Sequence, residues 1–238
     1  MLNILKRGIR LVALITLVVV VLSFAAKVAV YGLYNAPTQS QNKGPLFGEP
    51  GKETLYIALP NKADHVAGDE AARVVVIAYL SFGCPECAQY YRTLRKLARQ
   101  GVTVIYRHYQ PSWAFGSRAF IVAHAAECVA ERLGPEGFWE VADYIFANQD
   151  KIFGAAYDPL PPLLARFDML DAPFEECKDT GRHTERIDVN TKEALTIARQ
   201  MPITIVLDPR NAEAHLLIGA VDETDVQQRL MLITAVSQ

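Results

Sequence analysis

The residues of this chain best suited to chemistry are two cysteines in the tetrapeptide Cys84-Pro85-Glu86-Cys87. They follow the apolar run 74–80 and precede a helical pattern over 88–100. Side chains three positions apart at a helix start share one face, with Cβ atoms roughly 5–6 Å apart, so the two sulfurs can form and reopen a disulfide. Pro85 suits the first helical turn, where a backbone N–H has no partner. The unpaired N–H groups and the helix dipole favour a thiolate at Cys84, which is therefore the candidate nucleophile.

The alternative for this cysteine pair is half of a zinc site. Such a site needs two further Cys or His ligands at compact spacing, for example a second C-x₂-C, and the sequence contains none. The histidines that could be recruited are scattered: His108, His124 and His183. We therefore expect a redox pair, with no metal ion and no other cofactor.

The N-terminus carries the pattern of a membrane or export segment. Three basic residues precede the uncharged apolar run 11–26: Lys6, Arg7 and Arg10. Such residues place the amino end in the cytoplasm. The run alone reaches only ~24 Å of a ~30 Å hydrocarbon core, so a spanning helix would also need 28–33, with Lys27 snorkelling outward. A signal peptide cleaved at 23–25 is the alternative. In both cases the catalytic part is exported to the bacterial periplasm. It is either anchored in the inner membrane by residues 1–34, which then contact the lipid bilayer, or soluble after cleavage.

Export determines how the remaining cysteines, Cys128 and Cys177, are interpreted, because disulfides form outside the cytoplasm. They form either a structural bridge or two buried, unpaired side chains. We expect the bridge, since both cysteines fall in predicted helices and the compartment is oxidising. A disulfide that closes a loop of about 50 residues would add on the order of 4 kcal/mol to the free energy of unfolding.

Overall charge excludes one class of partner. The net charge is −2, from 24 Lys and Arg against 26 Asp and Glu, and no basic cluster follows the N-terminus. Neither DNA nor RNA is therefore expected as a partner. About 200 residues remain after the export segment, enough for one well-cored domain.

The elements that would position the cysteine pair alternate between strands and helices. Residues 35–53 have the composition of a flexible linker. A short strand at 54–58 and the runs 74–80 and 102–109 are predicted strands, and the last two flank the CPEC helix. Strand, helix and strand make a βαβ unit with parallel pairing and a right-handed crossover.

The second half of the chain is predicted to be helical until a closing hairpin. A helical pattern runs from 117 to 200, with apolar residues recurring three apart at Phe120, Ala123, Ala126 and Val129 and further helical stretches at 138–147, 160–167 and 182–199. Hairpin strands are expected at 203–207 and 215–218, and a final helix at 224–236. Phe138 and Trp139 are expected in the core.

This element order, over roughly residues 54–238, resembles the DsbA-like thiol–disulfide oxidoreductase family. Four motifs carry the resemblance: Phe82-Gly83-Cys84-Pro85-Glu86-Cys87, Arg107-His108-Tyr109, Ala125-Ala126-Glu127-Cys128, and Gly137-Phe138-Trp139-Glu140 followed by Phe146-Ala147-Asn148-Gln149. The resemblance implies an α/β, thioredoxin-like fold with an inserted α-helical subdomain at about 117–182.

The resemblance also implies that Met201-Pro202 is a cis-proline loop facing the cysteines. Proline removes its own N–H donor and leaves nearby backbone groups free, so such a loop can bind a substrate peptide as an added strand. Met201 would help to shape the surroundings of the thiols.

Two positions depart from the family pattern. Many relatives carry an acidic residue six positions before the first cysteine, where this chain has Ala78, so a buried proton-transfer carboxylate is missing. Many strongly oxidising relatives have His between the cysteines, whereas Glu86 should oppose a thiolate at Cys84. The expectation is a milder oxidant.

The sequence thus predicts a membrane-tethered thiol–disulfide oxidoreductase in which Cys84 attacks and Cys87 resolves. Its partners would be exported cysteine-containing proteins and a membrane or periplasmic redox protein. Two alternatives remain: a disulfide reductase or isomerase, and a non-catalytic peptide-binding protein of the cell envelope.

Overall fold

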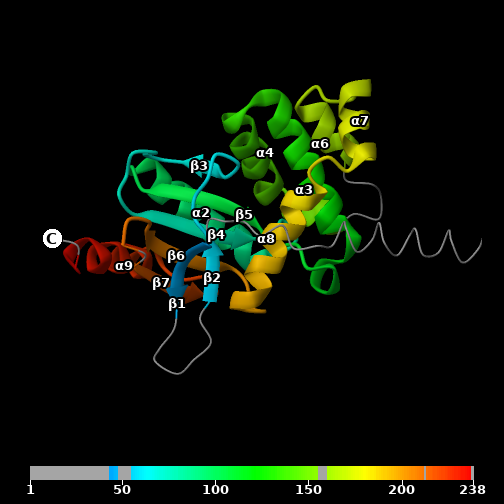
Figure 1. The fold of residues 1–238 in the computed structure, drawn as a ribbon. Helices are drawn as coiled ribbons and strands as arrows, with labels where there is room; N and C mark the ends of the chain where they lie inside the picture. The colour runs from blue at the N-terminus through cyan, green and yellow to red at the C-terminus, as the bar shows by residue number, and fades with distance from the viewer. Residues whose placement is uncertain (1–42, 48–54, 155–159, 212, 237–238) are drawn as a thin grey trace, which may run out of the picture. The chain divides into compact units, whose positions relative to one another are not determined.

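A computed structural model describes residues 43–47, 55–154, 160–211 and 213–236, all within a compact unit that spans Asn42–Gln238. A five-stranded sheet lies at its centre, in the order β3-β5-β4-β6-β7 (Figure 1). Its strands are β3 His65–Ala67, β4 Val75–Leu80, β5 Thr103–His108, β6 Ile203–Asp208 and β7 Glu213–Ile218.

The predicted βαβ unit is confirmed. Strands β4 and β5 pair in parallel, and helix α2 (Pro85–Arg99) connects them. All six residues of each strand are buried, as expected of β-branched runs covered on both faces. The register places Leu80 opposite His108, so the end of β4, where the cysteine loop begins, lies beside the end of β5.

The closing hairpin is also confirmed, because β6 and β7 pair antiparallel and β6 in turn pairs with β4. Strand β3 was not predicted. It has only three residues, too few for a period-two pattern to stand out, and it forms by pairing antiparallel with β5.

The predicted linker 35–53 is wrong in one part. Strand β1 (Lys43–Phe47) lies within it and pairs antiparallel with β2 (Leu55–Ala58). Backbone N–H and C=O groups can pair without an apolar pattern, so the composition of this segment gave no signal. The register shifts between Lys43 and Leu46, where Pro45 has no N–H to donate.

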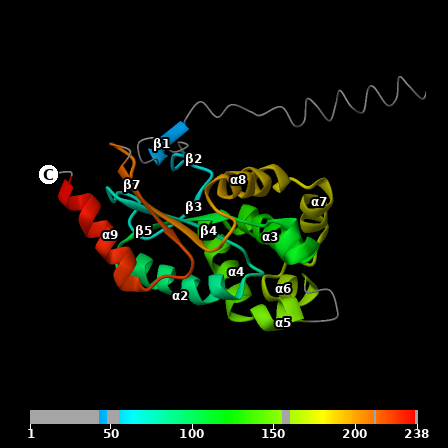
Figure 2. The ribbon, with the colours of Figure 1, turned by 90° about the horizontal axis from the view of Figure 1, so that it is seen from below.

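The helical half begins earlier than expected, at Ser112 rather than 117. Its helices are α3 Ser112–Leu133, α4 Pro135–Ala147, α5 Gln149–Gly154, α6 Leu160–Arg166, α7 Ala172–Thr180 and α8 Thr184–Ile197. The predicted helices at 138–147, 160–167 and 182–199 correspond to α4, α6 and α8, and that at 224–236 to α9 (Glu223–Val236). Helices α3 to α7 gather at one end of the sheet (Figures 1 and 2).

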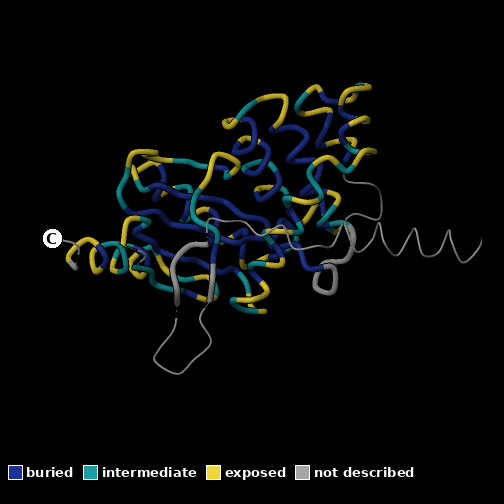
Figure 3. Tube along the Cα trace, viewed as in Figure 1, coloured by how far each residue is buried: buried dark blue, intermediate teal, exposed yellow. Residues whose placement is uncertain are grey.

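The sheet divides the core into two clusters. Helices α2 and α9 cover one face, and α8 covers the other together with β2 (Figure 2). Strands β4, β5 and β6, buried along their whole length, form the buried centre in Figure 3. Phe138 and Trp139 are buried in the larger cluster, as predicted, and the Trp139 indole N–H donates to the carbonyl of Val66 at 2.8 Å.

None of the helices within the described ranges is both long and apolar enough to cross a bilayer. The predicted anchor or signal segment, residues 1–34, lies outside those ranges.

Candidate active site

The two cysteines of the CPEC motif lie at the first turn of α2, immediately after the end of β4. Cys84 is the N-cap of α2, with an extended backbone, and Pro85 occupies the first helical turn. The sulfurs of Cys84 and Cys87 are joined in a disulfide, with the two Cα atoms 5.1 Å apart. The strand thus delivers the pair to the end of the sheet, and the helix orients both sulfurs.

A backbone amide in the first turn of α2 faces the Cys84 sulfur. The N–H of Cys87 donates to Cys84 Sγ at 3.1 Å, in the manner of a helix cap. A thiolate formed at this atom would accept the same hydrogen bond in charge-assisted form, at the positive end of the helix dipole. Glu86 Oε2 lies 3.6 Å from the sulfur, and its negative charge would act against that thiolate. The site therefore contains one stabilising and one opposing influence on the same atom.

Both sulfur-bearing residues are covered in this disulfide form. Cys84 is 1% exposed and Cys87 is fully buried, whereas Pro85 and Glu86 between them are exposed. Attack on Cys84 therefore requires a local displacement of the groups that cover it.

Gln149, at the start of α5, connects the helical half of the protein to the cysteine loop. Its side-chain amide nitrogen donates to the carbonyl oxygens of Phe82 and Cys84, both at 2.8 Å, and the residue is 9% exposed. In the sequence Gln149 stands out only as part of a motif in the insertion, because no local pattern indicates a bond across more than sixty residues. Gln149 is thus a site residue that only the fold reveals.

The Met201–Pro202 peptide bond is cis. Because Tyr79 pairs with Ile203, the loop lies beside the end of β4, at the end of the sheet that carries the cysteines. The carbonyl of Pro202 accepts a hydrogen bond from the N–H of Gly219 at 2.8 Å. Met201 is partly buried and packs against both core clusters, one of which contains Cys84 and Cys87. The structure thus brings Met201 and Pro202 to the same end of the sheet as the CPEC motif.

Ala78 is fully buried in β4, on the side of the sheet that faces α2. Ala78 pairs with Thr204 on the neighbouring strand β6, and the Thr204 hydroxyl donates to the hydroxyl of Tyr90 at 3.0 Å. Burial raises the pKa of Tyr90 to about 12. The polar groups identified near this position are therefore neutral hydroxyls at physiological pH.

A buried carboxylate does occur, on α3 rather than on β4. Glu127 is 1% exposed, and its Oε1 lies 2.8 Å from the Nε2 atoms of both His65 and His108. The guanidinium of Arg186 donates to Oε2 at 2.8 Å. The ring of His108 is 5.9 Å from that of Phe82, in the loop before the cysteines. This Glu127 cluster therefore lies next to the loop and was not recognised from sequence, since its members come from four separate elements.

The charge state of the Glu127 cluster follows from burial and hydrogen bonding. Burial alone would raise the pKa of Glu127, but the hydrogen bonds from His108 and His65 outweigh it and hold that pKa well below its usual range. Burial lowers the pKa of His65 to about 4, against the opposing effect of Glu127. An ionised Glu127 is thus balanced by Arg186, beside an uncharged His65.

The same three groups, His65, His108 and Glu127, are close enough to be considered as metal ligands. Metal-bound imidazoles donate their second N–H to an acceptor, and the Nδ1 of His108 is buried without a hydrogen-bond partner within the described parts of the chain. The geometry therefore fits a hydrogen-bonded carboxylate rather than a metal centre.

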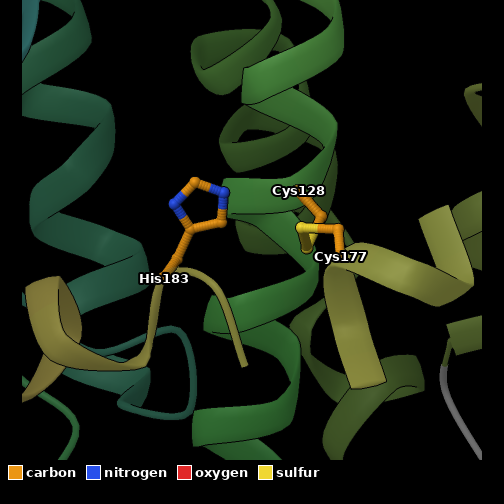
Figure 4. A group of neighbouring side chains, drawn as sticks. All are labelled: Cys128, Cys177 and His183. Carbon is orange, nitrogen blue, oxygen red and sulfur yellow. A yellow bond between two sulfur atoms is a disulfide. The ribbon is translucent and has the colours of Figure 1, made fainter. Parts of the chain in front are cut away.

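The second cysteine pair lies in the helical half. Cys128 on α3 and Cys177 on α7 are joined in a disulfide, with Cα atoms 6.0 Å apart (Figure 4). Both are almost fully buried, at 2% and 3% exposure. The two cysteines are 49 positions apart in the sequence, and their disulfide joins α7 to α3. Neither helix carries a cysteine of the CPEC motif.

Comparison with known proteins places this site in a family context. A family model described as Thioredoxin matches residues 60–214. The structure is similar to DsbA2 of Pseudomonas aeruginosa, with 26% identity, a TM-score of 0.62 and coverage of 74% of this chain and 97% of that one. It is also similar in fold to α-DsbA1 of Wolbachia pipientis, with 18% identity, a TM-score of 0.61 and coverage of 76% and 97%.

One curated relative is much longer than this chain. A stretch of 100 residues is 34% identical to part of the Na⁺/H⁺ antiporter NhaA 3 of Salinispora tropica. That match covers 41% of this chain and 15% of the antiporter.

Proposed function

Because the chain belongs to the thioredoxin family and is a DsbA-like thiol–disulfide oxidoreductase, we propose that it forms or exchanges disulfides in extracytoplasmic proteins through Cys84 and Cys87. The observation that carries this assignment is the amide of Cys87 directed at Cys84 Sγ from the first turn of α2. That contact stabilises negative charge on Cys84, which makes Cys84 the nucleophile of the reduced protein and the better leaving group when a mixed disulfide through it is resolved.

In the oxidising direction, a substrate thiolate attacks Cys84 Sγ and the Cys84–Cys87 bond breaks, so that Cys87 leaves as a thiolate and takes a proton. The second thiolate of the substrate then attacks its own sulfur in the mixed disulfide. Cys84 leaves with its electron pair, the substrate carries the new disulfide, and the enzyme is a dithiol. A redox partner in the membrane or the periplasm would return it to the disulfide form.

No carboxylate at position 78 assists the protonation of Cys87, and Tyr90 and Thr204 offer only neutral hydroxyls near that position. Proton transfer in the proposed cycle therefore uses water that reaches the opened loop. Glu86 makes the dithiol form less favourable than a His would, so the proposed enzyme is a mild oxidant. A shift of 30 mV corresponds to only ~1.4 kcal/mol, so the same residues also support reduction or isomerisation.

The substrate peptide is proposed to bind at the Met201-Pro202 loop. The loop lies at the cysteine end of the sheet, and a proline contributes no backbone N–H that would pair within the protein. An extended peptide placed there pairs with the neighbouring backbone, as in strand addition. This arrangement would bring a substrate cysteine towards Cys84 without requiring a particular substrate sequence.

The location of the protein is proposed from its sequence. The basic residues before the apolar run at 11–26 support export, and two disulfides in one chain agree with an oxidising compartment. We place the catalytic domain in the periplasm, held at the inner membrane by residues 1–34.

Trapping of a mixed disulfide tests the proposal. The full chain carrying Cys87→Ser, reduced and incubated with a protein that contains disulfides, should accumulate an adduct through Cys84 that disappears on reduction, because no second thiol releases it. Cys84→Ser is the matched control and should give none. If neither variant forms an adduct while the Cys84→Ser, Cys87→Ser protein still binds unfolded peptides, the protein is a peptide-binding scaffold instead.

A further inference from the structure

The two sulfurs of the second disulfide lie beside two further potential metal donors. The sulfurs of Cys128 and Cys177 and a ring nitrogen of His183 all lie within 4.8 Å of one another (Figure 4). Glu131 adds an oxygen, because its Oε2 is 2.8 Å from His183 Nε2 and 3.9 Å from Cys177 Sγ. Two sulfurs, one imidazole and one carboxylate form a donor set that zinc commonly takes.

Rigid elements hold these donors together. Cys128 and Glu131 lie three positions apart on α3 and therefore on one face of that helix. Cys177 lies on α7, and His183 is the N-cap of α8, after the left-handed turn at Gly181 that ends α7. The imidazole extends from this connection towards α3 (Figure 4). A site formed here would join all three helices.

Distances between the donors agree with a tetrahedral ion once the disulfide is open. With ordinary zinc bond lengths of about 2.0–2.3 Å, ligand atoms lie roughly 3.3–3.8 Å apart. The separations between Glu131 and its two neighbours, 2.8 and 3.9 Å, bracket that range. Reduction lets the two sulfurs move apart, and the 2.8 Å contact between His183 and Glu131 has to lengthen into the same range.

Charge and access are also suitable. Two thiolates and one carboxylate carry three negative charges, against two on zinc, and Arg182 binds the other oxygen of Glu131 and balances the remainder. The cysteines are buried, but His183 and Glu131 line a cavity of about 250 Å³ that opens to solvent, and their side chains are 18% and 37% exposed. An ion can thus reach His183 and Glu131 from solvent.

We propose that the reduced form of this disulfide is a zinc site, with Cys128, Cys177, His183 and Glu131 as ligands. Reduction by a protein dithiol transfers two electrons to the S–S bond, so that the dithiol becomes a disulfide and two thiols form here. Zinc then displaces both thiol protons to solvent. The ion replaces the covalent clip between α3 and α7, so the helical half keeps its fold in both redox states.

Cobalt substitution in the full chain tests the site. The protein carries Cys84→Ser and Cys87→Ser, so that the CPEC thiols cannot bind metal and the outcome is independent of the proposed catalysis. After reduction with a phosphine, one equivalent of Co²⁺ should give the visible bands of a tetrahedral ion and a thiolate-to-cobalt charge-transfer band, and Zn²⁺ should remove both. The same protein left oxidised should give neither.

Ligand variants separate a built site from adventitious thiol binding. His183→Ala should weaken Co²⁺ binding at least about tenfold, since even outer partners of a metal site contribute that much. His215→Ala, which changes a histidine in β7 outside the proposed site, is the matched control and should leave the Co²⁺ affinity unchanged. Equal affinity in the His183→Ala protein and its parent overturns the proposal.

A thermal measurement covers the case in which reduction unfolds the chain. Zn²⁺ should raise the unfolding temperature of the reduced protein, or restore its helical circular dichroism if that has been lost, and should leave the oxidised protein unaffected. A reduced protein that shows neither the cobalt spectrum nor this stabilisation has no site.

Discussion

The two disulfides of this protein join the same atoms in different surroundings. Cys84–Cys87 closes a loop of two intervening residues at a helix N-terminus, where a backbone amide is directed at one sulfur. Cys128–Cys177 spans 49 positions, with Cys128 in the interior of α3 and no such amide contact in the described structure. Exposure does not separate them, because all four cysteines are buried.

The difference shows what separates an exchanging bond from a clip. A helix N-terminus stabilises a thiolate, and a stabilised thiolate makes a good leaving group, which is why the first bond is the one proposed to exchange. A long closed loop restricts the unfolded chain, so the second bond stabilises. The sequence separation and the position on a helix thus assign different roles to chemically identical bonds.

The largest expected effect tests the clip. Cys128→Ser with Cys177→Ser should lower the free energy of unfolding by about 4 kcal/mol, because the denatured chain regains the freedom of the loop. Urea denaturation followed by circular dichroism measures the loss. Disulfide exchange at Cys84, assayed on a reduced protein substrate at a temperature where the variant is folded, should persist. Loss of exchange in a folded variant would contradict the division of roles.

The Glu127 cluster adjoins Cys128 on α3 and lies near the cysteine loop through His108 and Phe82, and its titration should appear as a pH dependence of stability. The pKa of His65 falls to about 4 in the folded state from 6.5, so the unfolded chain binds more protons between these values and stability falls as the pH is lowered through this window. The low pKa of Glu127 extends the loss below its unfolded pKa of 4.5. The contribution from His65 is up to about 3 kcal/mol across the window.

His65→Asn measures that contribution, because asparagine can still donate to Glu127 but does not titrate. Its free energy of unfolding should depend less steeply on pH between 6.5 and 4 than that of the parent. His215→Asn is the control at a partly exposed site. Parallel pH profiles for His65→Asn and the parent would show that His65 does not titrate as proposed.

Gln149 on α5 hydrogen-bonds to the loop that carries Cys84, and so connects the helical half to the disulfide that is proposed to exchange. Gln149→Met keeps the length of the side chain but removes both donors, leaving buried carbonyls of the cysteine loop without this partner, at a cost of about 1–3 kcal/mol. The reduction potential of Cys84–Cys87 should also shift, because the loop is less well positioned. Gln228→Met, at an exposed position of α9, is the matched control. A potential equal to that of the parent would limit Gln149 to a structural role.

Glu86 gives the smallest expected change. Glu86→His removes a negative charge 3.6 Å from Cys84 Sγ and should make the protein more oxidising, by about 30 mV or ~1.4 kcal/mol. Equilibration with glutathione measures the potential, and Glu86→Gln distinguishes loss of charge from gain of an imidazole. A more reducing value in both variants would reverse the argument.

Residues 74–109 were the easiest part of the fold to predict, because buried β-branched strands and a helix with a proline in its first turn leave local patterns. The CPEC motif could be identified from spacing alone for the same reason. β1 and β3 were missed because backbone pairing, rather than side-chain pattern, creates them.

The contacts of Gln149 and Glu127 could not have been predicted at all. Each bond joins residues 19 to 67 positions apart, and only the packing of the insertion against the sheet brings them together. The sequence did show that position 78 lacks a carboxylate, but it gave no indication that α3 supplies one elsewhere.

The two bonds of the Gln149 amide have a mechanical consequence. One of its acceptors, the carbonyl of Cys84, also accepts the first backbone hydrogen bond of α2 from Ala88. Moving α5 away from the cysteine loop would therefore remove one of these bonds and loosen the opening turn of α2, whose amide faces the Cys84 sulfur. A molecule that docks on the insertion and displaces α5 would in this way change the reduction potential of the Cys84–Cys87 disulfide without contacting it.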